Sequence, residues 1–132
     1  MSSTKKSKKS ARRDVTRMIG LLGGSGAIHL ARPKTYEGIV PEVMPGSANA
    51  WVKVSGVAEL GIAGLLLLPP TRKLGATLAA LLLVAVFPAN VKMARDFAAD
   101  PTKSSAARAV SIARLPLQVP MVTRALRIRR AA

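Results

Sequence analysis

The chain alternates long apolar stretches with short polar segments, and the apolar stretches are long enough to be membrane spans. They cover residues 15–31, 49–68, 74–93 and 109–126. An α-helix rises 1.5 Å per residue, so about 20 mostly apolar residues are needed to cross a bilayer. The third stretch is the strongest, because residues 74–91 contain no charged side chain. The pattern predicts an all-α protein, an integral membrane four-helix bundle.

The first and fourth stretches fit this prediction less well than the other two. The uncharged part of the first is only 14 residues long, and Arg17 and Arg32 at its ends would have to snorkel to extend it. The fourth stretch carries Arg114 and two prolines. We expect four spans, with these two as the weakest.

The polar segments between the stretches predict how the helices are joined. Pro69 and Pro70 end the second stretch, and the short turn after them allows only an antiparallel return. Residues 32–47 contain three prolines and two glycines, which favours a structured loop with short helical turns. Residues 94–108 form a polar connection, with a helix start expected at Ser104 or Ser105.

Both ends of the chain are basic. Residues 1–13 contain Ser, Thr, Lys and Arg and almost no apolar side chain, so burial cannot offset the entropy cost of ordering them. We therefore expect a disordered basic tail over residues 1–14. A four-helix domain follows over residues 15–126, and a second basic tail covers residues 127–132.

The chain has 21 Lys and Arg against 6 Asp and Glu, a formal net charge of +15. Nucleic acid would be one partner for such a charge, because cations that neutralise phosphates release counterions. The cations instead cluster at the ends of apolar stretches, which argues against nucleic acid and for a lipid bilayer. Basic segments beside a span gain roughly 1 kcal/mol per cation near anionic lipid, so anionic lipid is expected at the tails.

The distribution of cations also predicts an orientation. With four spans, 13 cations lie on the side of the two ends and the Arg72–Lys73 turn, against 6 in the opposite loops. Lys and Arg near span ends favour the cytoplasmic side. The sequence predicts a multi-pass protein of the plasma (inner) membrane with both termini in the cytoplasm.

Several polar residues fall at membrane depth, in the half of the domain away from the termini. Charged groups at that depth are costly unless they are paired or face a cavity, and an ion pair between Glu59 and Arg114 is available. Pro88 removes a helix hydrogen bond, and Asn90 or a water would satisfy the freed carbonyl. The candidate ligand-binding residues are His29, Glu59, Asn90, Arg114 and Gln118. Packing between helices is an alternative role for each of them.

Gly20 and Gly24 form a GxxxG pair in the first stretch, with Gly23 and Gly26 beside it. Small residues at this spacing let another helix backbone approach closely. Both packing inside the bundle and dimerisation remain open.

The sequence contains no recognisable catalytic motif. It has no cysteine, one histidine, and no HExxH, Walker or GxSxG pattern. We name no catalytic residue and no metal ligand, and expect a non-catalytic protein or an accessory subunit of an oxidoreductase complex.

Four strings, one near each stretch, together resemble the DoxX-like family of small four-helix membrane proteins: HLARPKTYEGIVPEVMP, VSGVAELGIAGLLLLPPTRKLG, VFPANVKMA and RLPLQVP. The resemblance covers about residues 18–122. It implies recurring positions at His29, Pro33, Pro41, Ser55, Gly56, Glu59, Pro88, Asn90, Arg114, Pro116 and Gln118. The sequence departs from the pattern at Leu30, where an aromatic residue is usual, and at Arg124, where the last span is usually apolar.

Relatives of this kind are linked to quinone-dependent and oxidative-stress membrane complexes. The resemblance therefore implies an accessory subunit of such a complex, with a quinone as the ligand considered and other subunits as partners. The alternative function is a small-solute or proton transporter that uses Glu59 and Arg114.

Overall fold

The computed structural model describes residues 3–38, 40 and 43–132, and it is entirely helical in that part of the chain. Its helices are α1 (Ser3–Ala31), α2 (Lys34–Glu37), α3 (Ala48–Leu67), the 3-10 turn η1 (Pro69–Thr71), α4 (Arg72–Ala85), α5 (Phe87–Ala99) and α6 (Ser105–Ala131). The all-α prediction is confirmed. Pro41, one of the positions implied by the DoxX-like resemblance, lies outside the described residues.

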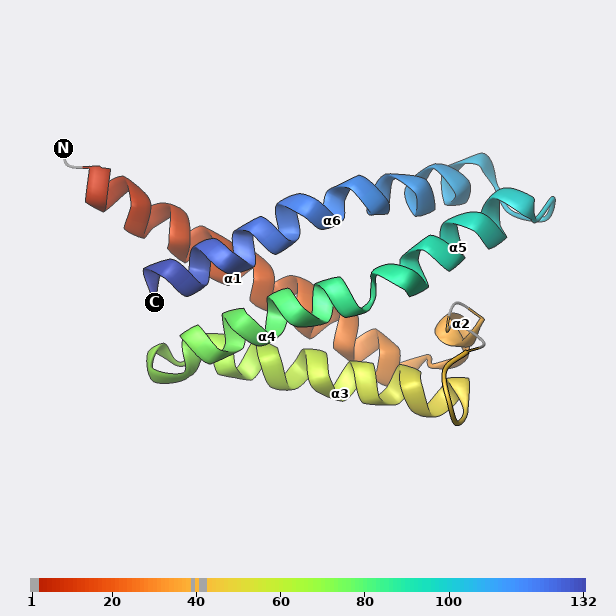
Figure 1. The fold of residues 1–132 in the computed structure, drawn as a ribbon, viewed down its shortest axis with the longest axis horizontal. Helices are drawn as coiled ribbons and strands as arrows, with labels where there is room; N and C mark the ends of the chain where they lie inside the picture. Colours follow the sequence, from red (N-terminus) through yellow and green to blue (C-terminus); the bar gives the residue numbers. More distant parts are fainter. Residues whose placement is uncertain (1–2, 39, 41–42) are drawn as a thin grey trace.

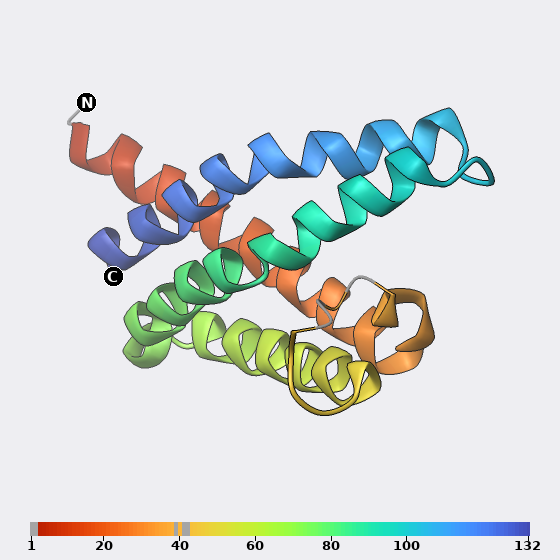
Figure 2. The same cartoon turned by 45° about the vertical axis from the view of Figure 1, so that its right-hand side comes forward.

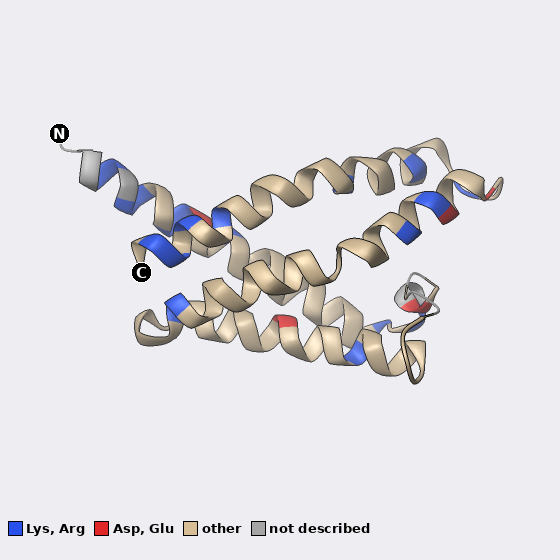
Figure 3. Ribbon diagram, viewed as in Figure 1, with Lys and Arg blue, Asp and Glu red and all other residues tan. Residues whose placement is uncertain are grey.

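The long helices contact one another in a ring. Helix α1 packs against α3 and α6, and α4 also packs against α3 and α6, while α5 continues along α6. Both termini and the turn between α3 and α4 lie at one end of the molecule (Figures 1 and 2). We call this the terminal end; α2 and the α5–α6 turn lie at the opposite end. Lys and Arg gather at the terminal end of α1 and α6 (Figure 3).

The structure describes the basic N-terminal segment from Ser3 onward as part of α1, where the sequence predicts a disordered tail over residues 1–14. The segment has more to bury than its composition suggests. Ala11 is 8 % exposed, and Asp14 is buried and contacts Arg127 of α6 at 3.0 Å. These contacts let α1 extend about three turns beyond the apolar stretch.

The third apolar stretch is not one continuous helix, because α4 ends at Ala85 and α5 begins at Phe87. Pro88 sits in the first turn of α5, where its missing N–H costs least. At the break the carbonyl of Leu83 accepts a hydrogen bond from Nε2 of Gln118. Gln118 of the facing helix therefore reaches the backbone at this break. The carbonyl that Pro88 leaves without its helix donor is that of Val84, so the expectation that Asn90 or a water satisfies it stays a prediction.

Side chains close the connections between helices. Thr71 donates to the carbonyl of Leu65 at 2.7 Å, and Nε of Arg72 donates to the carbonyl of Leu66 at 2.9 Å, so both satisfy the last carbonyls of α3. The predicted start of α6 is confirmed, because Ser104 is its N-cap and accepts from the amide of Ala107. In the preceding turn, hydrogen bonds from Thr102 hold the pKa of the Asp100 carboxyl below its ordinary value.

The buried apolar core occupies the terminal half of the molecule. It combines residues from α1, α3, α4 and α6, among them Met18, Leu66, Ala79 and Ile128. The other half holds the buried polar residues Glu59, Asn90, Ser111 and Gln118, as the sequence pattern predicts for three of them, while the buried Asp14 lies at the terminal end.

Glycine packing differs from the pattern predicted for α1. A Cβ at Gly20, Gly23 or Gly24 would meet nothing within 4 Å, so the GxxxG pair does not pack inside this chain. Gly26 is the residue that lets a neighbour approach, because its Cβ would lie 2.8 Å from the carbonyl oxygen of Gly56 in α3. The helices α1 and α3 therefore cross backbone to backbone at these two glycines.

Two stretches among the described residues are long and apolar enough to cross a membrane by length and composition. They are Ala48–Leu67 and Pro69–Ala99, which hold the second and third predicted spans. The first and fourth predicted spans, in α1 and α6, do not meet the same criteria.

Candidate functional site

A cavity of about 330 Å³ lies in the half of the molecule opposite the terminal end. Four of the five candidate residues line it, and each comes from a different helix: His29 from α1, Glu59 from α3, Asn90 from α5 and Arg114 from α6. Gln118, the fifth, is not a lining residue, but it accepts a hydrogen bond from Asn90. The structure therefore brings the whole predicted set to one place.

His29 and Glu59 form an ion-pair contact across the α1–α3 crossing. Nδ1 of His29 lies 3.2 Å from Oε2 of Glu59 and 2.6 Å from the carbonyl oxygen of Ser25. With a proton on Nδ1, the ring can donate to either of these acceptor oxygens. The pair can reach this distance because Gly26 and Gly56 hold the two helices close beside it.

Glu59 does not pair with Arg114, so the ion pair predicted from the sequence is replaced by the one with His29. Among the described residues, the hydrogen bond found for the Arg114 guanidinium runs to Sδ of Met93 at 3.7 Å. A thioether is a weak acceptor, and the guanidinium carries five N–H donors. Arg114 thus keeps strong donors at the cavity edge. The wrong partner was predicted because spacing along two helices fixes depth but not which faces meet.

Asn90 and Gln118 form a buried pair in the wall of the cavity. Nδ2 of Asn90 donates to Oε1 of Gln118 at 3.1 Å, and Gln118 in turn donates to the carbonyl of Leu83. The amide pair ties α6 to the break between α4 and α5. Gln118 therefore has a positioning role, while Asn90 presents its side chain to the cavity.

The remaining walls are mostly apolar and include residues that sequence reasoning did not single out. Trp51, Met44, Val52 and Leu82 line the space together with several alanines and valines, beside Pro88, which the sequence did single out. The indole Nε1 of Trp51 donates to the carbonyl of Pro45 at 2.5 Å, which fixes the ring at the cavity. The sequence gives little reason to assign these apolar residues to a site, since a single Trp in an apolar helix is typical of a core or interface residue.

The described part of the loop before α3 lies beside the cavity, and side-chain hydrogen bonds hold α2 and Gly38 in place. Asn49 donates to Glu37 of α2 at 2.8 Å, and Lys92 of α5 donates to the carbonyl of Gly38 at 2.7 Å. Val40 and Met44 of this loop reach the cavity. Residues 32–47, predicted as a structured loop with helical turns, thus contribute to the site.

Chemically, the cavity joins an apolar enclosure to a few fixed polar groups, which is the usual make-up of a small-molecule site. The His29–Glu59 pair can accept or release a proton, and Arg114 and Asn90 can donate hydrogen bonds to carbonyl oxygens. Among the described residues, no cluster of three or more His, Asp or Glu side chains forms a metal-binding group.

Comparison with known proteins places this chain with one family. A family model described as "Domain of unknown function (DUF8561)" matches residues 18–129, a range that includes every residue named above for the cavity. No curated protein and no solved structure matches the chain.

Proposed function

We propose that this chain, which belongs to the family of the domain of unknown function DUF8561, is a DoxX-like membrane protein that binds a quinone-like molecule in its polar cavity. In this proposal the four long helical elements span the plasma membrane as a bundle with both termini in the cytoplasm. The chain serves as an accessory subunit of a quinone-linked or oxidative-stress complex, and the cavity lies in the outer half of the bilayer.

Membrane insertion is supported by where the apolar side chains lie. In Ala48–Leu67 and in Pro69–Ala99, only 33 % of the most apolar 18-residue segment is buried inside the structure. The core helix of a soluble protein is mostly buried. Large apolar side chains such as Val57, Leu81, Val84 and Leu117 are more than half exposed on the outside of the helices. So much exposed apolar surface suits contact with lipid.

The observation that carries the ligand proposal is the convergence of His29, Glu59, Asn90 and Arg114 on one largely apolar cavity. A quinone head is a flat apolar ring with carbonyl oxygens on opposite sides. Trp51 and Pro88 offer surfaces for such a ring, and Arg114 and Asn90 offer donors for its oxygens. The His29–Glu59 pair, of which Glu59 is buried, supplies an exchangeable proton for an oxygen that becomes reduced.

Trp51 provides the test, because it is the single tryptophan of the chain and lines the cavity. Quinones quench indole fluorescence on contact. We expect a short-chain ubiquinone, added to the full chain in mild detergent, to quench Trp51 saturably. The Arg114→Gln variant should bind at least about tenfold more weakly, because a charge-assisted hydrogen bond contributes about 1.5–3 kcal/mol.

Arg95→Gln is the matched control for that titration. Arg95 is an exposed arginine of α5 that does not line the cavity, so its loss removes the same charge without touching the site. Linear, non-saturable quenching in the wild-type protein would refute the ligand proposal. Equal weakening by both arginine variants would refute the role of Arg114.

Proton transport is a second candidate function, favoured by the contact of His29 with the buried Glu59 beside a cavity. Liposomes that contain the full chain and a pH-sensitive dye test it. If the chain carries protons, a pH gradient should decay faster than in protein-free liposomes, and Glu59→Gln should abolish the difference. Asp96→Asn, at an exposed acid of α5, is the control. A decay equal to that of empty liposomes excludes transport.

A further inference from the structure

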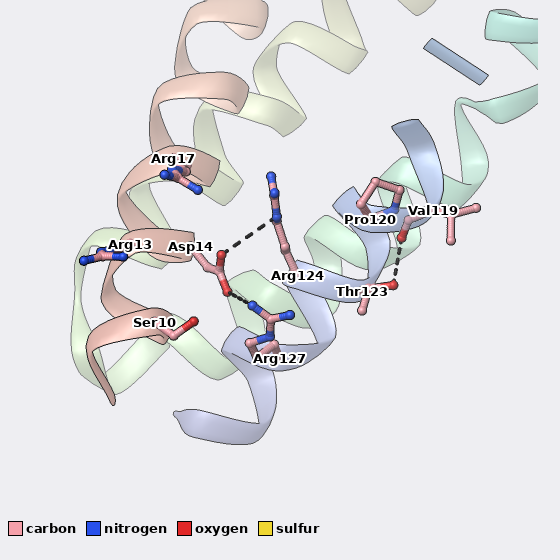
Figure 4. Close-up of a pocket in the computed structure, with 9 residues that line it drawn as sticks. All are labelled: Ser10, Arg13, Asp14, Arg17, Val119, Pro120, Thr123, Arg124 and Arg127. Carbon is pink, nitrogen blue, oxygen red and sulfur yellow. Dashed lines mark hydrogen bonds and ion pairs between the residues drawn. The ribbon is translucent and has the colours of Figure 1, made fainter. Parts of the chain in front are cut away.

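A second pocket, of about 440 Å³, lies between the terminal parts of α1 and α6 and shares no lining residue with the polar cavity. Four arginines line it: Arg13 and Arg17 from α1, and Arg124 and Arg127 from α6. Figure 4 shows these side chains with Asp14 among them. We call the five residues the arginine cluster.

Asp14 organises one side of this cluster. Its carboxylate is 4 % exposed and lies 3.0 Å from Nη1 of Arg127 and 4.0 Å from Nε of Arg124. Arg13 and Arg17 lie on the same helix face, and no acid of the described residues forms an ion pair with either of them. One acid against four guanidinium groups leaves the cluster with a formal net charge of +3, which an anionic ligand would offset.

The pocket is built by two helix faces with the same spacing. On α1 the lining positions are 10, 13, 14 and 17, and on α6 positions 120, 123, 124 and 127 repeat this spacing, with 119 beside them. Residues three and four apart share one face of a helix, so the two faces meet along the length of the pocket. The cluster is therefore a feature of the α1–α6 packing and not of a loose tail.

The cluster borders apolar surface on the side facing the middle of the helices. Val119 lines the pocket and is 69 % exposed, and Leu21, one turn beyond Arg17 on α1, is 45 % exposed. Arg17 and Arg124 fall at the ends of the first and fourth apolar stretches. A ligand there would have its charged group among guanidinium groups and an apolar part along the helices.

We propose that the arginine cluster is a binding site for the phosphate headgroup of an anionic phospholipid, with an acyl chain lying along Val119 and Leu21. Guanidinium groups bind phosphate oxygens through paired N–H donors, which suits this headgroup better than a zwitterionic one. The proposal uses the membrane placement argued above and is independent of the ligand in the polar cavity. It also accounts for Arg124, which departs from the DoxX-like pattern.

The test uses the full chain in dodecyl maltoside micelles that contain either phosphatidylglycerol or phosphatidylcholine. We expect phosphatidylglycerol to raise the thermal unfolding midpoint in a saturable way and phosphatidylcholine to leave it unchanged. The double variant Arg13→Gln, Arg17→Gln should require at least about tenfold more phosphatidylglycerol for the same shift. Both side chains are exposed, so the variant should fold, with unaltered Trp51 emission as the check.

Lys8→Gln with Lys9→Gln is the matched control, because it removes the same charge from exposed positions of α1 outside the pocket. Its lipid requirement should change less than about twofold if the site is local. Equal losses in both double variants would show attraction to the basic helix in general and overturn the proposal. A matching midpoint shift from inorganic phosphate would overturn the lipid assignment, and so would displacement of phosphatidylglycerol by a single-stranded oligonucleotide.

Discussion

The Gly26→Val variant is expected to lower the free energy of unfolding by about 1–3 kcal/mol, the usual cost of overpacking a tight contact. A Cβ at this position would lie 2.8 Å from the backbone oxygen of Gly56 and 2.9 Å from Cγ of Leu60. The first of these atoms belongs to a helix backbone and cannot turn aside, so α1 and α3 must separate. Thermal or denaturant unfolding of the full chain in detergent measures the loss.

Gly24→Val is the control for this prediction, because it places the same side chain two residues away, where nothing lies within 4 Å. Both variants carry the same low helix propensity of valine, so the difference between them isolates the contact with α3. Equal unfolding free energies for the two variants would contradict the backbone crossing at Gly26.

The Gly26→Val substitution should also disturb the polar cavity. His29 follows Gly26 by about one turn, and its Cβ lies 2.9 Å from where a Cβ on Gly56 would stand. Separation of α1 from α3 would lengthen the 3.2 Å contact between His29 and Glu59. We therefore expect weaker ubiquinone quenching of Trp51 in Gly26→Val than in Gly24→Val.

The Gln118→Leu variant should lose about 2–6 kcal/mol of stability, for a different reason. Leucine fits the volume but can neither donate to the Leu83 carbonyl nor accept from Asn90, so two buried polar groups lose their partner. Each unsatisfied buried group costs about 1–3 kcal/mol. Unfolding in detergent, monitored by helical circular dichroism, gives the value.

A double-mutant cycle with Asn90→Leu separates the pair from the backbone contact. If the Asn90–Gln118 hydrogen bond exists, the double variant should cost less than the sum of the single variants, by about 0.5 kcal/mol or more. Strict additivity would mean that the two amides do not interact, and that the loss in Gln118→Leu comes from Leu83 alone.

Much of the candidate site could be predicted from the sequence because depth along a helix follows from residue number. His29, Glu59, Asn90, Arg114 and Gln118 lie at similar depths in four elements, and the structure brings them together. The pairing of Glu59 was predicted wrongly, because the rotation of each helix about its axis depends on packing. Gly26 and Gly56 set that rotation for α1 and α3, and they bring His29 to Glu59.

The N-terminal segment is a case in which local composition does not predict the structure. Composition alone predicts disorder for residues 1–13, since few of them can be buried. In the structure this segment is helical, and at its end Asp14 forms ion pairs with Arg124 and Arg127 of α6, nearly the whole chain away. A contact between residues 113 positions apart leaves no local trace in the sequence.

The sequence by itself determined the all-α class, the apolar stretches and the helix start at Ser104. It also determined that polar residues from four helices lie at the same end of the folded molecule. These follow from local rules, because periodicity, capping and hydropathy act over one or two helical turns. Only the tertiary structure decided that Glu59 pairs with His29, that Gln118 bridges the α4–α5 break, and that four arginines share one pocket. Those outcomes depend on which helix faces meet, and that is set by close packing between segments distant in the chain.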